Sequence, residues 1–233
     1  AMIGGMVGNN SSGTTSIVYG VTRDKVISLN TILSDGKKVV FRALSPEDFK
    51  RKCGQKDLEG TLYRQALEEL SSPEARAEIH AQFPKKSIHR RNTGYAVDEL
   101  LKASQFEGTE NFNFCKLLSG SEGTLAVTTE IKISLDPLPD PIEIVVAAHF
   151  ESIHESMKSA QVAMKHEVTA VELMDKIILD CTKESIEYSK NRYFVEGDPK
   201  ALLMIEFRGK TLEEAMAKGE ALIADLKAAG YGY

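Results

Sequence analysis

A glycine-rich run near the start limits the possible folds more than any other feature of this 233-residue sequence. Gly4–Gly13 holds four glycines and four asparagines or serines in ten positions. Glycine weakens helices and strands, but it permits positive φ and lets a ligand approach backbone N–H groups closely. Asparagine and serine add short hydrogen-bond donors. The run therefore predicts a loop that binds a pyrophosphate or another polyanion, with a plain surface turn as the alternative.

A second glycine-rich run, Ser119–Leu125, lies far along the chain and precedes an apolar, β-branched stretch at 126–131. Either run alone is weak evidence, because lone glycine motifs also occur in ordinary turns. The two runs gain specificity when they are considered together with three shorter motifs. These motifs are Tyr19–Gly20, Asn92–Tyr95 and Leu135–Pro139.

With these five motifs, the chain resembles the FAD-binding fold of the vanillyl-alcohol-oxidase (PCMH-type) group. Within that group it is most similar to the branch of FAD-linked D-lactate, glycolate and D-2-hydroxyglutarate dehydrogenases. The resemblance implies an FAD-dependent oxidoreductase that oxidises a small D-2-hydroxy acid by hydride transfer to the flavin. Two alternatives stay open: a UDP-sugar reductase of the same FAD fold, and a non-catalytic α/β domain whose glycine runs are turns.

The resemblance also implies which residues contact FAD. The expected cofactor-binding residues are Gly5, Gly8, Asn9, Asn10, Ser11, Ser12, Gly13, Tyr19, Gly20, Gly120, Ser121, Glu122, Gly123 and Thr124. For Glu122, a role as a helix cap or salt-bridge partner stays open. We expect Gly13→Val or Asn10→Leu to abolish flavin retention with little loss of folding, because bulk on this loop blocks the ligand.

Concentrated positive charge precedes the motif at 92–95, in a cluster formed by Lys85, Lys86, His89, Arg90 and Arg91. This cluster is either a solvated edge or a contact for the flavin or an acidic substrate. The candidate catalytic residues are therefore Arg90, Arg91 and Tyr95, where Tyr95 either stacks near the flavin or packs in a core. The sequence identifies no catalytic base.

Composition and spacing exclude several other functions. A net charge of −5 with interspersed signs argues against nucleic acid as a partner. The longest apolar run, 144–148, is far shorter than the roughly 20 residues that span a bilayer. Three widely spaced cysteines and five scattered histidines predict no metal site and indicate reduced thiols in the cytoplasm. The electron acceptor stays open, with a fused iron–sulfur domain in a longer parent protein as one candidate.

The predicted fold class is α+β, with two parts. Residues 1–140 are expected to form the second half of a PCMH-type FAD-binding domain, with a helical insertion at about 45–115. Residues 141–233 are expected to form a ferredoxin-like α/β cap domain that lacks one closing strand, because strands and helices alternate after the prolines at 137–141. Both ends suggest an internal fragment, which we expect to bind FAD weakly or not at all by itself.

Local patterns predict individual elements. Residues 26–41 read as a β-hairpin with Ile27, Leu29 and Leu33 on one face. Helical periodicity predicts helices at 60–70, 96–103 and 175–189, the last with Ile178, Cys181 and Ile186 roughly on one side. Ser72 as N-cap, with Pro73 at the first helical position, predicts a helix at 73–83. Capping boxes predict further helices after Ser152 and Thr211. In the helix after Ser152, the pattern places Ile153, Met157, Ala160 and Met164 on the buried face.

Overall fold

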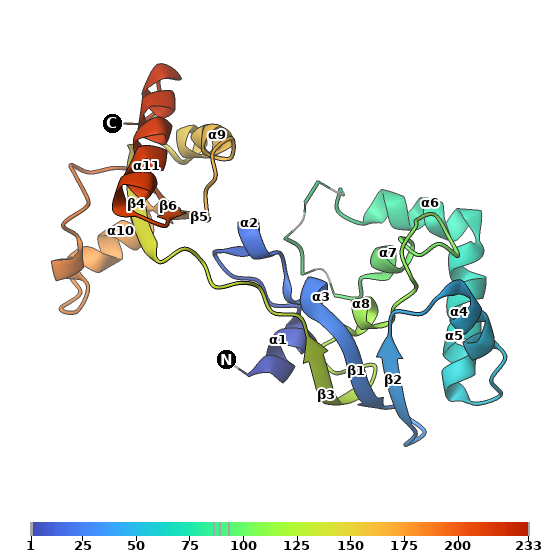
Figure 1. The fold of residues 1–233 in the computed structure, drawn as a ribbon. Coiled ribbons are helices and arrows are strands. Elements are labelled where there is room, and N and C mark those ends of the chain that lie inside the picture. Colours follow the sequence, from blue (N-terminus) through green and yellow to red (C-terminus); the bar gives the residue numbers. More distant parts are fainter. Residues whose placement is uncertain (1, 86, 89, 93, 233) are drawn as a thin grey trace. The chain divides into compact units, whose positions relative to one another are not determined.

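The computed structural model describes residues 2–85, 87–88, 90–92 and 94–232, and Figure 1 shows its elements along the chain. Lys86 and His89 of the basic cluster, and Thr93, lie outside the described residues. The chain divides into two compact units. Unit 1 comprises Ala1–Gly13 and Gly20–Asp136, and unit 2 comprises Thr14–Tyr19 and Pro137–Tyr233.

Unit 1 contains a three-stranded antiparallel sheet with the strand order β2-β1-β3. The strands are β1 (Val26–Ile32), β2 (Lys38–Arg42) and β3 (Val127–Ile133). The predicted hairpin is confirmed by the antiparallel pairing of β1 with β2. The prediction for Ile27 is wrong: Ile27 is 44% exposed, whereas Leu29 is fully buried. The register of β1 against β3 shifts between Val26 and Ser28, and this irregularity turns Ile27 away from the core.

Helices on the sheet's flank enclose an aromatic core. They are α4 (Pro46–Cys53), α5 (Leu58–Ser71), α6 (Pro73–Gln82), α7 (Val97–Leu100) and α8 (Cys115–Leu118). Tyr63 of α5 and Phe112 are fully buried with ring centroids 5.8 Å apart. The predicted cap of α6 is confirmed, because the Ser72 hydroxyl accepts from the Ala75 N–H. The helix predicted at 96–103 is confined to the four residues of α7.

The first glycine-rich run is not the loop that its composition predicts. Ile3–Asn9 forms helix α1, and the loop begins only at Asn10. Asn10 has the left-handed conformation (φ 54°) and ends the helix, while its N–H bonds to carbonyls of the last turn. Val7 is the buried residue of α1, and Gly4 and Gly5 are exposed. Two short helices follow, α2 (Ser16–Tyr19) in unit 2 and α3 (Thr22–Lys25) in unit 1.

Unit 2 alternates strands and helices, as predicted. Its elements after α2 are β4 (Ile142–Phe150), α9 (Ile153–Ala163), β5 (Ala170–Asp175), α10 (Lys176–Lys183), the 3-10 turn η1 (Ser189–Asn191), β6 (Ala201–Gly209) and α11 (Leu212–Ala228). Strand β6 lies between β4 and β5 and is antiparallel to both. The core of this unit lies between the sheet and helices α9 and α11, whose buried members include Ala163, Leu222 and Leu226.

The predicted inner face of α9 is wrong except at Ala160, which is partly buried against the core. The buried residues of this helix are Ser156, Ser159 and Ala163, whereas Ile153, Met157 and Met164 are exposed. The two serine hydroxyls donate to the carbonyls of Ile153 and Ser156, which makes their burial tolerable. The capping box at Ser152 therefore predicted the helix, but apolar periodicity did not predict its packed face.

Helix α10 is shorter than the predicted span of 175–189, because it ends at Lys183. Leu179 is its buried residue, whereas Ile178, Cys181 and Ile186, which we predicted to lie roughly on one side, are exposed. The N-terminus is fixed by Asp175, whose carboxylate accepts from the Ile178 N–H.

Candidate functional site

The two glycine-rich runs come together in unit 1. The Gly120 N–H donates to the Val7 carbonyl at 3.0 Å, and the Glu122 N–H donates to the Gly8 carbonyl at 2.8 Å. The Asn9 amide adds a third link by donating to the Glu122 carboxylate at 2.7 Å. We refer to Gly8–Gly13 and Gly120–Thr124 together as the glycine cradle. The first half of the cradle lies at the end of helix α1, and the second half follows the end of helix α8.

Backbone conformation explains why this composition is needed at the cradle. Gly120 and Gly123 have positive φ values of 96° and 73°, and Glu122 has the left-handed value of 53°. A Cβ atom built on Gly13 or Gly123 meets no described atom within 4 Å. The cradle therefore exposes backbone next to open space, which suits close approach of a polyanion or a flavin nucleotide.

The segment around Arg90 and Tyr95 joins the cradle from a third direction. Arg90 donates from Nε to the Ser12 hydroxyl at 3.1 Å, and the hydroxyls of Tyr95 and Thr124 share a hydrogen bond of 2.6 Å. Tyr95 is 47% exposed, so it is not a core residue. The predicted residues from three distant parts of the sequence thus lie in one place.

Other predicted cofactor residues lie elsewhere or have structural roles. Gly5 is an exposed helical residue of α1, and Tyr19 belongs to unit 2. Gly20 has a positive φ of 71°, which favours glycine, and a Cβ there would also lie 2.6 Å from the Asp24 carboxylate. Ser121 is buried and its carbonyl accepts from the Thr124 hydroxyl.

Asn10 and Arg23 form the interior support of the cradle. The fully buried Asn10 side chain accepts the Arg23 N–H at 2.8 Å. The Arg23 guanidinium donates from Nε to the Lys116 carbonyl at 2.7 Å and from Nη2 to the Ser119 carbonyl at 2.6 Å. Burial lowers the pKa of Arg23 from its ordinary value, and nearby Glu99 partly offsets that effect. No sequence pattern points to Arg23, because a single buried arginine in a polar stretch has no periodicity.

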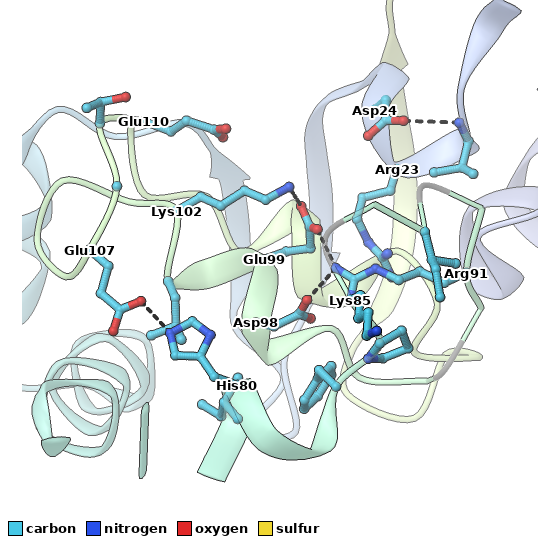
Figure 2. Close-up of a pocket in the computed structure, with 18 residues that line it drawn as sticks. Arg23, Asp24, His80, Lys85, Arg91, Asp98, Glu99, Lys102, Glu107 and Glu110 are labelled. Atoms are coloured by element: carbon cyan, nitrogen blue, oxygen red, sulfur yellow. Dashed lines mark hydrogen bonds and ion pairs between the residues drawn. The ribbon is translucent and has the colours of Figure 1, made fainter. Parts of the chain in front are cut away.

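Beside Arg23 lies a pocket of about 390 Å³, which Figure 2 shows with its lining side chains. Arg91 points into it and is held by the carboxylates of Asp98 and Glu99, the latter at 2.6 Å. Lys102 also binds Glu99, at 2.7 Å. Burial acts to raise the pKa of Glu99, but Lys102 and Arg91 hold it below its ordinary value. Arg91 is thus neutralised within the protein, whereas Arg90 is exposed at the cradle.

Sequence reasoning did not identify Asp98 and Glu99, although the spacing of Glu99 and Lys102 by three residues was an available signal. Glu99→Gln is expected to lower the free energy of unfolding at pH 7 by about 1–3 kcal/mol, the cost of weakening a buried hydrogen-bonded charge. Because the pKa of Glu99 is lower in the folded protein, its contribution is full above its ordinary value of 4.5 and fades as the pH falls below it.

Urea unfolding at pH 7, and then stepwise from pH 5 to pH 3, checks this prediction. The stability difference between wild type and Glu99→Gln should narrow as the pH falls. Glu78→Gln, an exposed position on α6, serves as the control. A difference that stays constant down to pH 3 would contradict the role of Glu99.

The remaining candidate groups offer little chemistry. Burial raises the pKa of Cys115 to about 12, and its thiol donates to the Phe41 carbonyl, so it is a structural residue. Within the described residues, no group of three or more histidine, cysteine, aspartate or glutamate side chains could hold a metal ion. Among the same residues, no helix is both long and apolar enough to cross a membrane.

Comparisons with known proteins identify relatives of both units. Residues 141–232 match the family described as FAD linked oxidases, C-terminal domain. Over 97% of its length, the chain is 30% identical to D-2-hydroxyglutarate dehydrogenase from Pseudomonas putida, and it covers 22% of that protein. Over 90% of its length, it is 24% identical to the mitochondrial D-lactate dehydrogenase (cytochrome) from Arabidopsis thaliana, and it covers 25% of that protein.

A solved structure of alkyldihydroxyacetonephosphate synthase resembles the chain with a TM-score of 0.52 at 16% identity. That match covers 97% of this chain and 31% of the other, and it supports the predicted α+β fold. The chain spans about a fifth to a quarter of the length of the curated relatives that it matches.

Proposed function

We propose, from the premise that residues 141–232 are an FAD linked oxidase C-terminal domain, that this chain is part of an FAD-dependent dehydrogenase of D-2-hydroxy acids. The observation that carries the proposal is the glycine cradle, in which predicted cofactor residues from distant segments are joined by hydrogen bonds. The names of the curated relatives support the substrate class, which includes D-2-hydroxyglutarate and D-lactate.

The residues present fit the cofactor. Open space beside Gly13, Gly94 and Gly123 leaves room for a flat or extended ligand against the backbone. Ser12 and Thr124 place hydroxyl groups on the two halves of the cradle, and the Tyr95 hydroxyl bonds to that of Thr124. When bound, FAD would supply the electron chemistry by accepting a hydride from the substrate. The cradle residues would bind and orient FAD, while Arg90 would attract the carboxylate of the substrate.

The proposal extends to the organisation of the parent protein. We assign residues 1–140 to the FAD-binding domain and residues 141–233 to the cap domain. A fused iron–sulfur domain as electron acceptor and a cytoplasmic location remain part of the proposal. A UDP-sugar reductase is disfavoured by the match of residues 141–232, and a non-catalytic domain by the convergence of the two glycine runs.

The direct test is to purify the full-length protein and record its visible spectrum before and after adding FAD. We expect a bound, yellow flavin that is bleached when D-2-hydroxyglutarate or D-lactate is added without oxygen. Bound flavin that none of the D-2-hydroxy acids reduces would remove the substrate assignment. A protein that binds no flavin would remove the whole proposal.

Gly13→Val separates ligand approach from folding. The exposed Gly13 has no described atom within 4 Å of an added Cβ, so the fold should accept the larger side chain. We expect the Kd for FAD in the full-length protein to rise at least about tenfold, equivalent to about 1.4 kcal/mol of lost contact. Isothermal titration with FAD and a thermal melt check both parts, and Gly4→Ala on exposed α1 is the control. Unchanged FAD affinity would show that the run is structural only.

Arg90→Met tests the anion contact. A charge-assisted hydrogen bond to a substrate carboxylate contributes about 1.5–3 kcal/mol, so kcat/KM should fall by about one to two powers of ten with flavin content unchanged. Steady-state kinetics with D-lactate, glycolate and D-2-hydroxyglutarate measure the effect, with the exposed Arg51→Met as the control. A change within about twofold would place Arg90 at a solvated edge, and lost flavin would make it a cofactor contact.

A further inference from the structure

Arg23 is the residue that connects the supports of both halves of the glycine cradle, through its backbone to one half and through its side chain to the other. Through its backbone N–H it bonds to Asn10, the residue that ends α1. Through its guanidinium it bonds to the carbonyls of Lys116 and Ser119, at the end of α8. One residue therefore fixes the two helix ends from which the two glycine-rich runs continue.

Close packing shows how little freedom this arrangement leaves. Arg23 is 4% exposed, and a Cβ on Gly120 would lie 2.9 Å from its Nη2 atom. The guanidinium thus lies directly behind Gly120, in contact distance of the cradle backbone. A planar group with fixed donors holds two carbonyls in one geometry, which a lysine ammonium on a flexible chain does not.

Charge adds a second argument. Within the described residues, no carboxylate lies within 4 Å of Arg23 in an ion pair, unlike Arg91 beside it. Its guanidinium donates to carbonyl oxygens that belong to the cradle's own support, and the carboxylates of Glu99, Asp98 and Asp24 act on its charge without hydrogen bonds to it. A buried cation in this position makes the electrostatic potential at the cradle more positive, which favours an anionic ligand.

We propose that Arg23 is a positioning residue for the cofactor, which holds the two glycine-rich runs in the register that binds an anionic flavin nucleotide. This inference deepens the proposed function and rests on it for the identity of the ligand. It also makes a claim that needs no ligand: the hydrogen bonds from Gly120 to Val7 and from Glu122 to Gly8 depend on Arg23.

The test compares Arg23→Gln and Arg23→Lys in the full-length protein with a matched control, Arg64→Gln. Arg64 also binds backbone carbonyls, at 2.7 Å for Cys53, but it joins α4 to α5 away from the cradle. Two quantities are measured: the Kd for FAD by titration of the apoprotein, and hydrogen exchange of the Gly120 and Glu122 amides without FAD.

We expect Arg23→Gln to raise the Kd for FAD at least about tenfold and to speed exchange of both amides by a similar factor. Arg23→Lys should give a Kd for FAD and amide exchange rates between those of Arg23→Gln and wild type, since lysine keeps the charge but not the fork of donors. Arg64→Gln should leave both unchanged, even if it lowers the Tm.

Wild-type FAD affinity and wild-type exchange in a folded Arg23 variant would overturn the inference, as would an equal loss in Arg64→Gln. If Arg23→Gln does not fold, the comparison of Arg23→Lys with Arg64→Gln decides. If the wild-type protein binds no FAD, the proposed function fails, and amide exchange alone then decides whether Arg23 holds the two runs together.

Discussion

Asn10→Leu is expected to lower the free energy of unfolding of unit 1 by about 2–5 kcal/mol, far more than its position in a ligand loop would suggest. Two costs add. Leucine disfavours the left-handed backbone that residue 10 adopts, by about 1–2 kcal/mol. The buried Arg23 N–H then loses its acceptor, which costs about 1–3 kcal/mol. The sequence-based expectation of little folding loss at this position is therefore revised.

Two variants separate these costs. Asn10→Gly keeps a residue that accepts positive φ but removes the side chain, which accepts from the Arg23 N–H and donates to the Arg91 carbonyl, so it should lose about 1–3 kcal/mol. Asn9→Leu, at the exposed neighbouring position, loses two exposed hydrogen bonds, to Glu122 and from Ser11, and should cost about 1 kcal/mol. Urea unfolding and hydrogen exchange of the Arg23 amide measure the differences. Equal stability of Asn10→Leu and Asn9→Leu would contradict the structural role of Asn10.

The meeting of the two glycine-rich runs could be predicted from sequence, but the structure of each run could not. The resemblance to the family implied that Asn9 and Glu122 both contact the cofactor, and therefore that they lie close together. It did not predict the hydrogen bond between them. Composition alone made Gly4–Gly13 a loop, because glycine is a poor helix former. The cost of glycine in a helix is about 1 kcal/mol each, and tertiary contacts such as the bond from Gly120 to Val7 outweigh it.

The packing of unit 2 shows the same limit. Capping residues Ser152 and Thr211 act through local hydrogen bonds, so the starts of α9 and α11 could be read from sequence. The buried face of α9 could not, because it consists of Ser156, Ser159 and Ala163 rather than of its largest apolar residues. Burial there depends on how closely the helix approaches the sheet, which no local pattern records.

In the candidate site too, contacts with other residues decide what the local sequence leaves open. Arg90 and Arg91 are neighbours of equal charge, and sequence offered no reason to separate them. The carboxylates of Asp98 and Glu99 separate them in the structure, because they bind Arg91. Arg90 is left exposed beside Ser12.

Gly120→Ala is expected to be the most damaging small substitution in the cradle, with a loss of about 2–5 kcal/mol. Positive φ at residue 120 accounts for about 1–2 kcal/mol of it. The new methyl group would also lie 2.9 Å from Arg23 Nη2 and 3.3 Å from the Gly94 carbonyl. Displacing Arg23 weakens its charged hydrogen bond to Ser119, at about 1.5–3 kcal/mol.

Gly123→Ala is the matched control, because Gly123 has a similar positive φ but open space around its Cβ position. It should cost only the backbone term of about 1–2 kcal/mol. The excess loss in Gly120→Ala is then the energy of contact with Arg23 and Gly94.

A double-mutant cycle between Gly120→Ala and Arg23→Gln identifies the source of that excess. If the methyl group acts by displacing the guanidinium, the second substitution should cost less in the presence of the first, with a coupling energy of about 0.5–3 kcal/mol. Additive losses would assign the excess to the Gly94 carbonyl instead. Urea unfolding of the four proteins gives the coupling directly, and it needs no bound flavin.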